Sequence, residues 1–203
     1  MLPKISLETA RLILRPIAFT DAPAIQKLAS DRAIADTMIS IPHPYPEGEA
    51  ENYISRKIAE FQNGQSVAFA IECQQEKLVR GAIEIRDIDR EHSGAELSFW
   101  LGVESWGKGY MSEALPLMLE FGFENLHLNR LYAYHMLRNP ASGKVLQKNG
   151  FIQEGVLRQR VRKWEVFEDV VLLAILYRDW KHQQRTEVLI TNRFVVRTSV
   201  LIN

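Results

Sequence analysis

The chain has 203 residues, of which 46% are hydrophobic, so it is long enough for one buried core and too short to require two domains. Lysine plus arginine and aspartate plus glutamate each number 25, and the resulting net charge of zero provides no global field to attract nucleic acid. The single cysteine excludes an intrachain disulfide framework and fits a reducing compartment.

The hydrophobic segments are too short for a membrane protein. Residues 1–6 contain no apolar signal core, and the longest apolar run, residues 170–176, is far shorter than a bilayer-spanning helix. We therefore expect a cytoplasmic protein without a membrane or nucleic-acid partner.

The chain is expected to begin with a strand and a helix. Residues 11–15 have an apolar centre flanked by arginines and are followed by Pro16, which favours an edge-like strand. Thr20 is then expected to cap a helix whose buried stripe includes Ile25 and Ala29.

The next segment predicts a loop, a second helix and a hairpin. Three prolines within residues 42–46 exclude regular structure there and predict a shaped loop. A helix is expected over residues 48–63, because apolar residues recur at helical spacing and Gly64 can end it. Residues 67–72 and 79–86 are typical of two strands joined by a polar turn.

A glycine-spaced turn follows the strand expected over residues 94–103. Gly107 and Gly109 allow positive φ and let a ligand approach the backbone, and the helix that follows favours an anion at its start. A P-loop would need Lys-Ser or Lys-Thr after its second glycine, and a dinucleotide-binding loop would need a third glycine where Ser112 stands. The turn therefore predicts a phosphate ligand but matches neither nucleotide motif.

The helix after this turn contains a proline. Pro116 cannot donate a hydrogen bond to the carbonyl of Ser112, and its ring crowds that carbonyl. We therefore expect a bend or an irregular first turn near Met111 and Ser112.

The rest of the chain predicts a strand over residues 130–137, a short helix over 139–149 and strands over 151–161 and 167–177. The order βααβββαβαββ, without an internal repeat or linker, indicates an α+β fold with a mainly antiparallel sheet. Residues 186–203 carry two apolar clusters, and we expect them either to add a strand, in this subunit or a neighbouring one, or to be disordered.

Seven short motifs follow one another along the chain. They are Glu8-Thr9-Ala10-Arg11-Leu12, Pro42-His43-Pro44-Tyr45, Ala95-Glu96-Leu97-Ser98-Phe99-Trp100-Leu101, Trp106-Gly107-Lys108-Gly109-Tyr110, Asn139-Pro140-Ala141-Ser142, Asn149-Gly150-Phe151 and Glu154-Gly155. In this order and spacing they resemble the GNAT superfamily of N-acyltransferases, and within it the branch of the RimJ and RimL ribosomal-protein N-terminal acetyltransferases. The resemblance covers roughly residues 7–181.

The resemblance implies a single GNAT domain over residues 1–184, followed by an extension of unknown role over 185–203. It implies a mixed, mainly antiparallel central sheet with helices on both faces. The strands before and after the loop helix would be splayed, and acetyl-coenzyme A would lie in the gap as co-substrate. The residues expected to bind it are Trp100, Leu101, Val103, Trp106, Gly107, Lys108, Gly109, Tyr110, Met111, Asn139 and Ser142.

The reaction implied by the resemblance is direct attack of an amine on the thioester. Ser142 would be the general acid for the departing thiolate. Asn139 would contact the pantetheine arm, cap the short helix, or do both.

The general base does not carry over from the family. RimL-type proteins have a carboxylate at the position that Val161 occupies in this sequence. Glu96 is the first substitute, either facing the acceptor pocket or lying half-exposed on its strand, and Asp169 and Glu84 follow as further candidates.

The acceptor is expected to be a protein N-terminus or a small-molecule amine. A lysine side chain with a pKa near 10.4 is only about 0.1% neutral at pH 7.4, which costs roughly 4 kcal/mol, whereas an α-amine costs under about 1 kcal/mol. The missing carboxylate at Val161 therefore favours amines of low pKa.

Other functions stay open from the sequence. A catalytically idle acyl-coenzyme A binding protein would also explain Val161, and a nucleotide-binding module would also use the glycine turn. Arg158, Arg160 and Arg162 form either a solvated face or a site for an acidic acceptor. The five histidines show no ligand spacing, so no metal is expected, and the chain is either a monomer or a homodimer.

Overall fold

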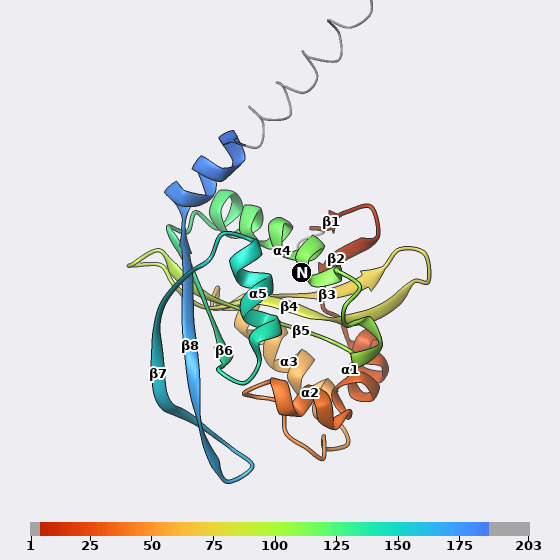
Figure 1. The fold of residues 1–203 in the computed structure, drawn as a ribbon. Helices are drawn as coiled ribbons and strands as arrows, with labels where there is room; N and C mark the ends of the chain where they lie inside the picture. Colours follow the sequence, from red (N-terminus) through yellow and green to blue (C-terminus); the bar gives the residue numbers. More distant parts are fainter. Residues whose placement is uncertain (1–4, 187–203) are drawn as a thin grey trace, which may run out of the picture.

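A computed structural model describes residues 5–186, which build one mixed sheet with helices on both faces (Figure 1). The strands of this part of the chain are β1 (Leu7–Glu8), β2 (Leu12–Pro16), β3 (Val67–Cys73), β4 (Leu78–Asp89), β5 (Gly94–Leu101), β6 (Arg130–Met136), β7 (Ile152–Lys163) and β8 (Val166–Leu176). The helices are α1 (Ala22–Ala29), α2 (Arg32–Thr37), α3 (Glu49–Gln62), α4 (Tyr110–Glu120), α5 (Pro140–Lys148) and a helix over residues 177–186.

The sheet is antiparallel except where β5 pairs with β6. Its strand order is β1-β2-β3-β4-β5-β6-β8-β7, and only β5 and β6 run parallel. Their pairing joins Gly94 to Arg130, Ala95 to Leu131 and Glu96 to Tyr132, and it extends no further within the described residues. The predicted α+β fold and the predicted splay of these strands are therefore confirmed.

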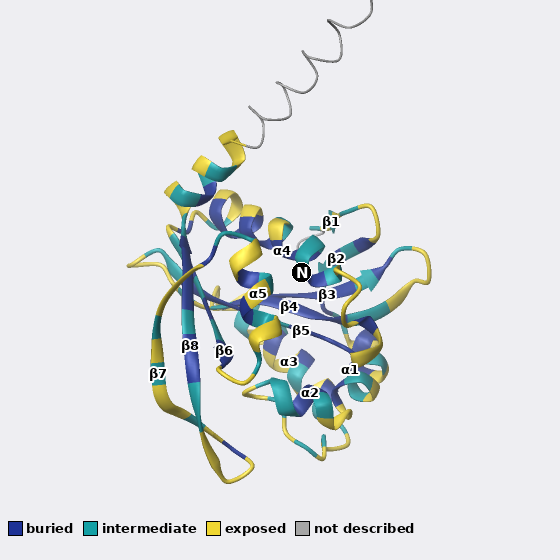
Figure 2. Cartoon of the chain, in the orientation of Figure 1, coloured by how far each residue is buried: buried dark blue, intermediate teal, exposed yellow. Residues whose placement is uncertain are grey.

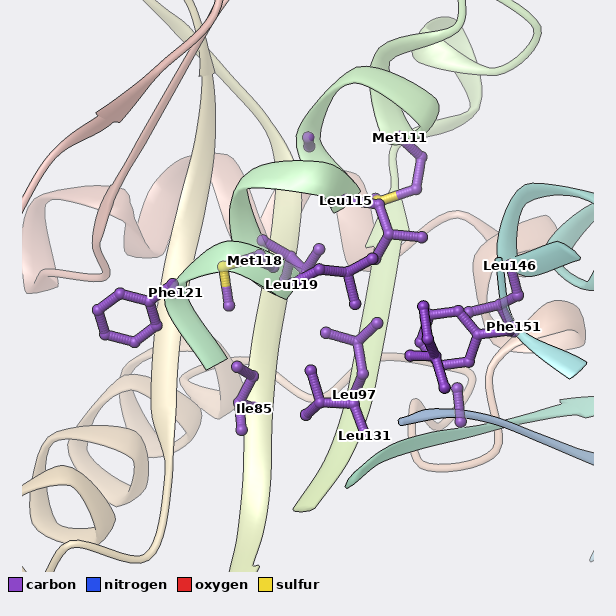
Figure 3. Close-up of a cluster of buried hydrophobic side chains, with 14 of the residues drawn as sticks. Ile85, Leu97, Met111, Leu115, Met118, Leu119, Phe121, Leu131, Leu146 and Phe151 are labelled. Carbon is purple, nitrogen blue, oxygen red and sulfur yellow. The ribbon is translucent and has the colours of Figure 1, made fainter. Parts of the chain in front are cut away.

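One face of the sheet packs against α4 and α5. Figure 3 shows a cluster of buried side chains in which residues of α4 point toward the central strands and toward α5. The labelled members are Ile85, Leu97, Met111, Leu115, Met118, Leu119, Phe121, Leu131, Leu146 and Phe151. Because each fully buried side chain of this size contributes roughly 1.5 to 3 kcal/mol, this cluster anchors α4 and the turn before it.

The other face of the sheet is covered by α1, α2 and α3. Ile25, Ala29 and Ile54 are buried there against Ala82 and Trp100 of the sheet. Figure 2 shows that burial is concentrated in the central strands, whereas β7, at the edge of the sheet, is largely exposed.

Strand alternation decides which face the polar residues take. Ile83 and Ile85 of β4 join the core beneath α4, so Glu84 and Arg86 point to the opposite, α1–α3 face. Glu96 lies opposite Arg86 in the pairing of β4 with β5 and shares that face. The sequence pattern thus places three charged side chains in the middle of the sheet.

Several elements differ from the sequence-based expectations. The expected Thr20 cap is wrong, because α1 begins at Ala22 after a 3-10 turn over Phe19–Asp21. Asp21 is buried in that turn, where it accepts a hydrogen bond from the Ala18 N–H at 2.9 Å and forms an ion pair with Arg15 at 2.8 Å.

Three short or terminal elements were not predicted. These are β1, α2 and the helix over residues 177–186. Both β1 and α2 are too short for a hydrophobic period to stand out. Of the expected tail over residues 186–203, positions 187–203 lie outside the described residues. Among the helices of residues 5–186, none combines the length and hydropathy needed to cross a bilayer.

The helix after the glycine turn is more regular at its start than expected. α4 runs without interruption through Pro116, so the predicted irregular first turn is wrong. Pro116 lies on the exposed side, where its ring does not disturb the buried face. The irregularity occurs instead at the end, where the chain widens into a π-helical turn over Phe121–Asn125.

We predict that Pro116→Ala raises the free energy of unfolding by about 1 to 3 kcal/mol, because alanine restores a donor for the Ser112 carbonyl. Urea denaturation of the two proteins measures the difference. Glu120→Ala, at another exposed position of α4, is the matched control and should change stability by less than about 0.5 kcal/mol. An unchanged or lower stability of Pro116→Ala would show that the carbonyl is satisfied by another donor.

Candidate active site

The glycine turn presents unpaired backbone donors at the start of α4. Gly107 and Gly109 have φ of 71° and 78°, as the sequence predicted. The N–H groups of residues 107–109 donate to no acceptor within the described part of the chain. Together with the dipole of α4, these donors form a site suited to an anion.

A cleft of about 430 Å³ lies between this turn, the end of β5 and the start of α5; we call it the glycine-turn cleft. Nine of the eleven predicted cofactor-binding residues line it: Trp100, Leu101, Trp106, Gly107, Gly109, Tyr110, Met111, Asn139 and Ser142. Sequence reasoning missed Thr37 and Met38 in its wall, because α2 was not predicted.

Val103 and Lys108, the other two predicted residues, lie outside this lining. Val103 belongs to a short 3-10 turn and is 37% exposed. The Lys108 side chain is exposed, and its carbonyl accepts a hydrogen bond from Arg11 at 3.0 Å. The carbonyl of Leu101 is also engaged, since it accepts from the Trp106 indole N–H at 2.7 Å.

Asn139 and Ser142 form the start of α5. The Asn139 side chain caps the helix by accepting from the Ser142 N–H, and its amide donates to Ser142 Oγ at 3.0 Å. Because Oγ already accepts this hydrogen bond, the Ser142 hydroxyl keeps its own hydrogen for another partner. Asn139 is therefore a helix cap that also faces the cleft.

Glu96 lies where β5 and β6 begin to separate. A small cavity of about 40 Å³, which we call the interstrand cavity, is lined by Glu96, Ser98, Tyr134 and Ser142 among others. The Glu96 side chain is 12% exposed and accepts a hydrogen bond from Arg86 at 2.6 Å. Burial raises the pKa of the Glu96 carboxyl, and the opposing effect of Arg86 does not cancel this shift.

His135 is packed beneath α5. Its Nδ1 lies 2.9 Å from the Met136 carbonyl, which makes Nδ1 the donor. A Cβ placed on Gly143 would come within 2.6 Å of His135 Nε2, so the glycine lets α5 approach the imidazole. These contacts make His135 a packed histidine whose ring also borders the interstrand cavity.

On the α1–α3 face lies a third cavity of about 230 Å³, which we call the charged pocket. The Lys57 ammonium lies 3.0 Å from Glu84 Oε2 and 2.8 Å from Glu60 Oε2. The buried Oε2 of Glu84 has no hydrogen-bond partner and makes only an ion pair with Lys57. Glu84 thus carries a hydrogen-bond acceptor that no donor among the described residues satisfies.

The remaining walls of the charged pocket are aromatic and apolar. Tyr45 and Tyr53 line it, and burial raises the pKa of both phenols, to about 12 for Tyr45, so they act as neutral hydroxyls. The loop that contains Pro42 closes one side, in agreement with its prediction as a shaped segment.

The three cavities adjoin one another. Met38 lines all of them, Ser142 borders both the glycine-turn cleft and the interstrand cavity, and Ser98 borders both the interstrand cavity and the charged pocket. A ligand in the cleft and a ligand in the charged pocket would therefore meet beside Ser142 and Glu96.

Other predicted residues lie away from these cavities. Asp169 accepts a hydrogen bond from the Gln159 N–H at 2.8 Å, which stabilises an irregularity in β7. Gln159 has a φ of 51°, so the alternation assumed for the three arginines of β7 is interrupted there. Arg158, Arg160 and Arg162 are all exposed and border none of the three cavities.

The tip of the β7–β8 hairpin holds the loop that closes the charged pocket. Lys163 is buried, and its ammonium donates to the carbonyls of Met38 and Ile41 at 3.0 and 2.5 Å. Burial lowers the pKa of this amine. The neighbouring Trp164 donates to Asp36 of α2 at 2.5 Å. No sequence signal marks a lysine that binds backbone carbonyls 122 to 125 residues away.

The sequence matches the model of a family described as acetyltransferase (GNAT) domain over residues 11–152, which is more than half of the chain. The chain belongs to the GNAT acetyltransferase family. The uncharacterized N-acetyltransferase p20 of Bacillus licheniformis is 31% identical over 175 residues, covering 86% of this chain and 98% of that protein. The uncharacterized N-acetyltransferase YoaA of Bacillus subtilis is 34% identical over 158 residues, covering 75% of this chain and 86% of that protein.

A solved structure extends this similarity to the fold. The GNAT domain superposes on RimL, a ribosomal L7/L12 alpha-N-protein acetyltransferase in complex with coenzyme A, with a TM-score of 0.79 and 20% identity. The match covers 85% of this chain and 98% of RimL. The resemblance inferred from the motifs is thus confirmed, and the protein is an N-acetyltransferase by its family.

We predict that Lys163→Met lowers the stability of this GNAT domain by about 1 to 3 kcal/mol, because two carbonyls lose a charged donor while the aliphatic volume is kept. Chemical denaturation measures the change. Lys148→Met, at an exposed position of α5, is the control and should leave stability nearly unchanged. If both variants unfold like the wild type, the loop does not depend on Lys163.

Proposed function

We propose that the protein transfers the acetyl group of acetyl-coenzyme A to a primary amine, which is either a protein N-terminus or a small-molecule amine. The observation that carries this proposal is the contiguity of the three cavities at Met38, Ser98 and Ser142. It supplies a donor site and an acceptor site that open on a common point. The family membership supports the reaction class.

The glycine-turn cleft fits the donor. Its unpaired N–H groups at residues 107–109 suit the pyrophosphate. The β6-facing side of β5 is free of a strand partner beyond Glu96, so its backbone, apart from the engaged Leu101 carbonyl, is available to the amides of the pantetheine arm. A thioester at the end of that arm would reach the interstrand cavity.

Ser142 is proposed as the general acid. As the amine nitrogen bonds to the carbonyl carbon and gives up a proton to the base, the carbon–sulfur bond breaks and the thiolate takes the proton of the Ser142 hydroxyl, which Ser142 regains from solvent. The hydrogen bond that Oγ accepts from Asn139 directs that proton away from Asn139 and toward the cleft. The N-terminal end of α5 stabilises negative charge on the departing sulfur.

Glu96 is proposed as the general base, directly or through a water molecule. Its ionised form is supported by Arg86 at 2.6 Å, and its buried position at the strand separation brings it to the side of the charged pocket. Asp169, on β8, accepts a hydrogen bond from Gln159 of β7, which leaves Glu84 as the second candidate for the base. Glu84 is better placed to hold the acceptor, because it lines the charged pocket and does not line the interstrand cavity.

The charge balance of the pocket favours an acceptor with a single amine. Three carboxylates, Glu49, Glu60 and Glu84, are matched by three cations, Arg56, Lys57 and Arg86. A pocket without net charge offers no added attraction to a polyamine. An α-amine, which is partly neutral at physiological pH, needs neither a negative field nor a strong base. The name of RimL, an alpha-N-protein acetyltransferase, agrees with this preference.

Release of free thiol from acetyl-coenzyme A tests the function. The panel contains N-terminal peptides, polyamines and amino acids, and we expect the highest kcat/KM with α-amines. Binding of acetyl-coenzyme A without thiol release for any amine would instead indicate an idle acyl-coenzyme A binding protein. Binding of ATP as tight as that of coenzyme A would indicate a nucleotide-binding module.

We predict that Ser142→Ala lowers kcat by about 10² or more at saturating substrates, because general acid catalysis contributes at least this factor. The dissociation constant of coenzyme A should change little. Ser30→Ala, which removes an exposed hydroxyl at the C-terminal cap of α1, serves as the control. A wild-type turnover rate in Ser142→Ala would remove this residue from the mechanism.

We predict that activity falls as the pH decreases through the pKa of Glu96, because the base must be ionised. Burial raises this pKa, so the fall lies at a higher pH than for an ordinary carboxyl group. Glu96→Gln should lower kcat and abolish this acidic limb of the kcat profile. Glu154→Gln, an exposed carboxylate on β7, should retain the limb. Retention of both rate and limb by Glu96→Gln would exclude Glu96 as the base.

A further inference from the structure

An ion-pair cluster lies behind the glycine turn, on residues that the proposed reaction does not use. The Arg11 guanidinium contacts Glu113 through Nε at 2.6 Å, and the Arg11 backbone N–H donates to the same carboxylate at 3.1 Å. Thr9 Oγ1 donates to Glu113 as well. Although burial favours the neutral carboxyl, these hydrogen bonds lower the pKa of Glu113. The cluster therefore joins the β1–β2 turn to the first turn of α4.

The β1–β2 turn is itself held from the other side. Gln74, in the turn between β3 and β4, donates to the carbonyls of Thr9 and Leu12 at 2.6 and 3.3 Å. The Leu12 N–H donates to Thr9 Oγ1 at 2.9 Å. Arg11 thus extends from a braced turn, and its position is set by the sheet and not by the glycine turn.

Arg11 also reaches the glycine turn directly. Its Nη1 donates to the Lys108 carbonyl at 3.0 Å, and its guanidinium lies 4.8 Å from the centroid of the Tyr110 ring. Arg11 is absent from the lining of the glycine-turn cleft, whereas Gly109 and Tyr110 line it. The guanidinium therefore contacts the turn without forming part of the cleft wall.

Because of the geometry of the peptide bond, this contact also sets the direction of the Gly109 N–H. In a planar trans peptide the C=O and the N–H point in opposite directions. The Lys108 carbonyl and the Gly109 N–H belong to one peptide, so a carbonyl held outward by Arg11 turns the Gly109 N–H toward the cleft. Gly109, with φ of 78°, has few steric restraints of its own on this peptide.

We propose that Arg11 is a positioning residue for the donor site, which fixes the Lys108–Gly109 peptide so that its N–H faces the pyrophosphate. Glu113 and Thr9 orient the guanidinium for this contact. The inference rests on the proposed function, since it assigns the cleft to coenzyme A. It names a charged side chain outside the cleft that determines donor affinity.

A direct electrostatic role makes the opposite prediction for one variant. If Arg11 acted only as positive charge near the phosphates, Glu113→Gln would remove a competing negative charge and leave binding equal or tighter. If Arg11 acts by orienting the peptide, Glu113→Gln frees the guanidinium and weakens binding. The sign of this change separates the two roles.

The test is the dissociation constant of coenzyme A, measured by calorimetry on the full chain. We expect Arg11→Gln and Glu113→Gln each to weaken binding by about tenfold, the loss of one charged hydrogen bond. Arg130→Gln is the matched control, because Arg130 pairs with Glu154 at 2.5 Å on the surface away from the cleft. It should bind coenzyme A like the wild type.

An acetyl donor that lacks phosphates shows whether the loss in Arg11→Gln arises at the pyrophosphate. With S-acetylpantetheine as donor and a saturating amine, Arg11→Gln should match the wild-type kcat/KM, since only the pyrophosphate contact is impaired. An equal loss with both donors would indicate general distortion and overturn the inference. Unchanged coenzyme A affinity in Arg11→Gln, or tighter binding by Glu113→Gln, would overturn it as well.

The same measurements keep this inference separate from the proposed function. If the wild type does not bind coenzyme A, the proposed function fails, and the role of Arg11 fails with it. If the wild type binds coenzyme A and releases thiol while Arg11→Gln binds equally well, only the role of Arg11 fails.

Discussion

The structure depends on the short parallel contact between β5 and β6. Three residue pairs join these strands, and the backbone of β5 beyond Glu96 loses its neighbour on that side. Unpaired backbone groups in the interior are costly, so this edge is stable only where a ligand or water can bond to it. The separation therefore creates both a gap in the sheet and a set of polar groups that favour its occupation.

The two faces of the sheet divide the proposed substrates between them. The α4–α5 face supplies the glycine turn and the helix start at Asn139, which suit an anion and a departing thiolate. The α1–α3 face supplies Glu84, Lys57 and the aromatic walls of the charged pocket. The gap between β5 and β6 connects the two faces, so a thioester from one side and an amine from the other can meet there.

Buried charges in this protein come in partnered sets. Isolated buried ions are strongly unfavourable, and the buried Lys57 and Glu96 each have an oppositely charged neighbour within 3.0 Å. Replacing such sets by apolar residues would often cost no stability, so their presence here agrees with a polar ligand in the charged pocket. The buried Lys163 is stabilised in the same way, by backbone carbonyls in place of a carboxylate.

The sequence by itself determined the order of most elements, the glycine turn, the Asn139–Ser142 cap and the family, because these depend on local spacing. It also determined the face of β5 on which Glu96 lies, because Glu96 alternates with the core residue Leu97. Only the tertiary structure decided that Arg11 reaches Glu113, that Lys163 holds the loop at Met38, and that Asp169 accepts a hydrogen bond from the Gln159 N–H. These contacts join residues distant in the chain, and pairing across such distances depends on strand register and bulges, which hydrophobic periodicity does not encode.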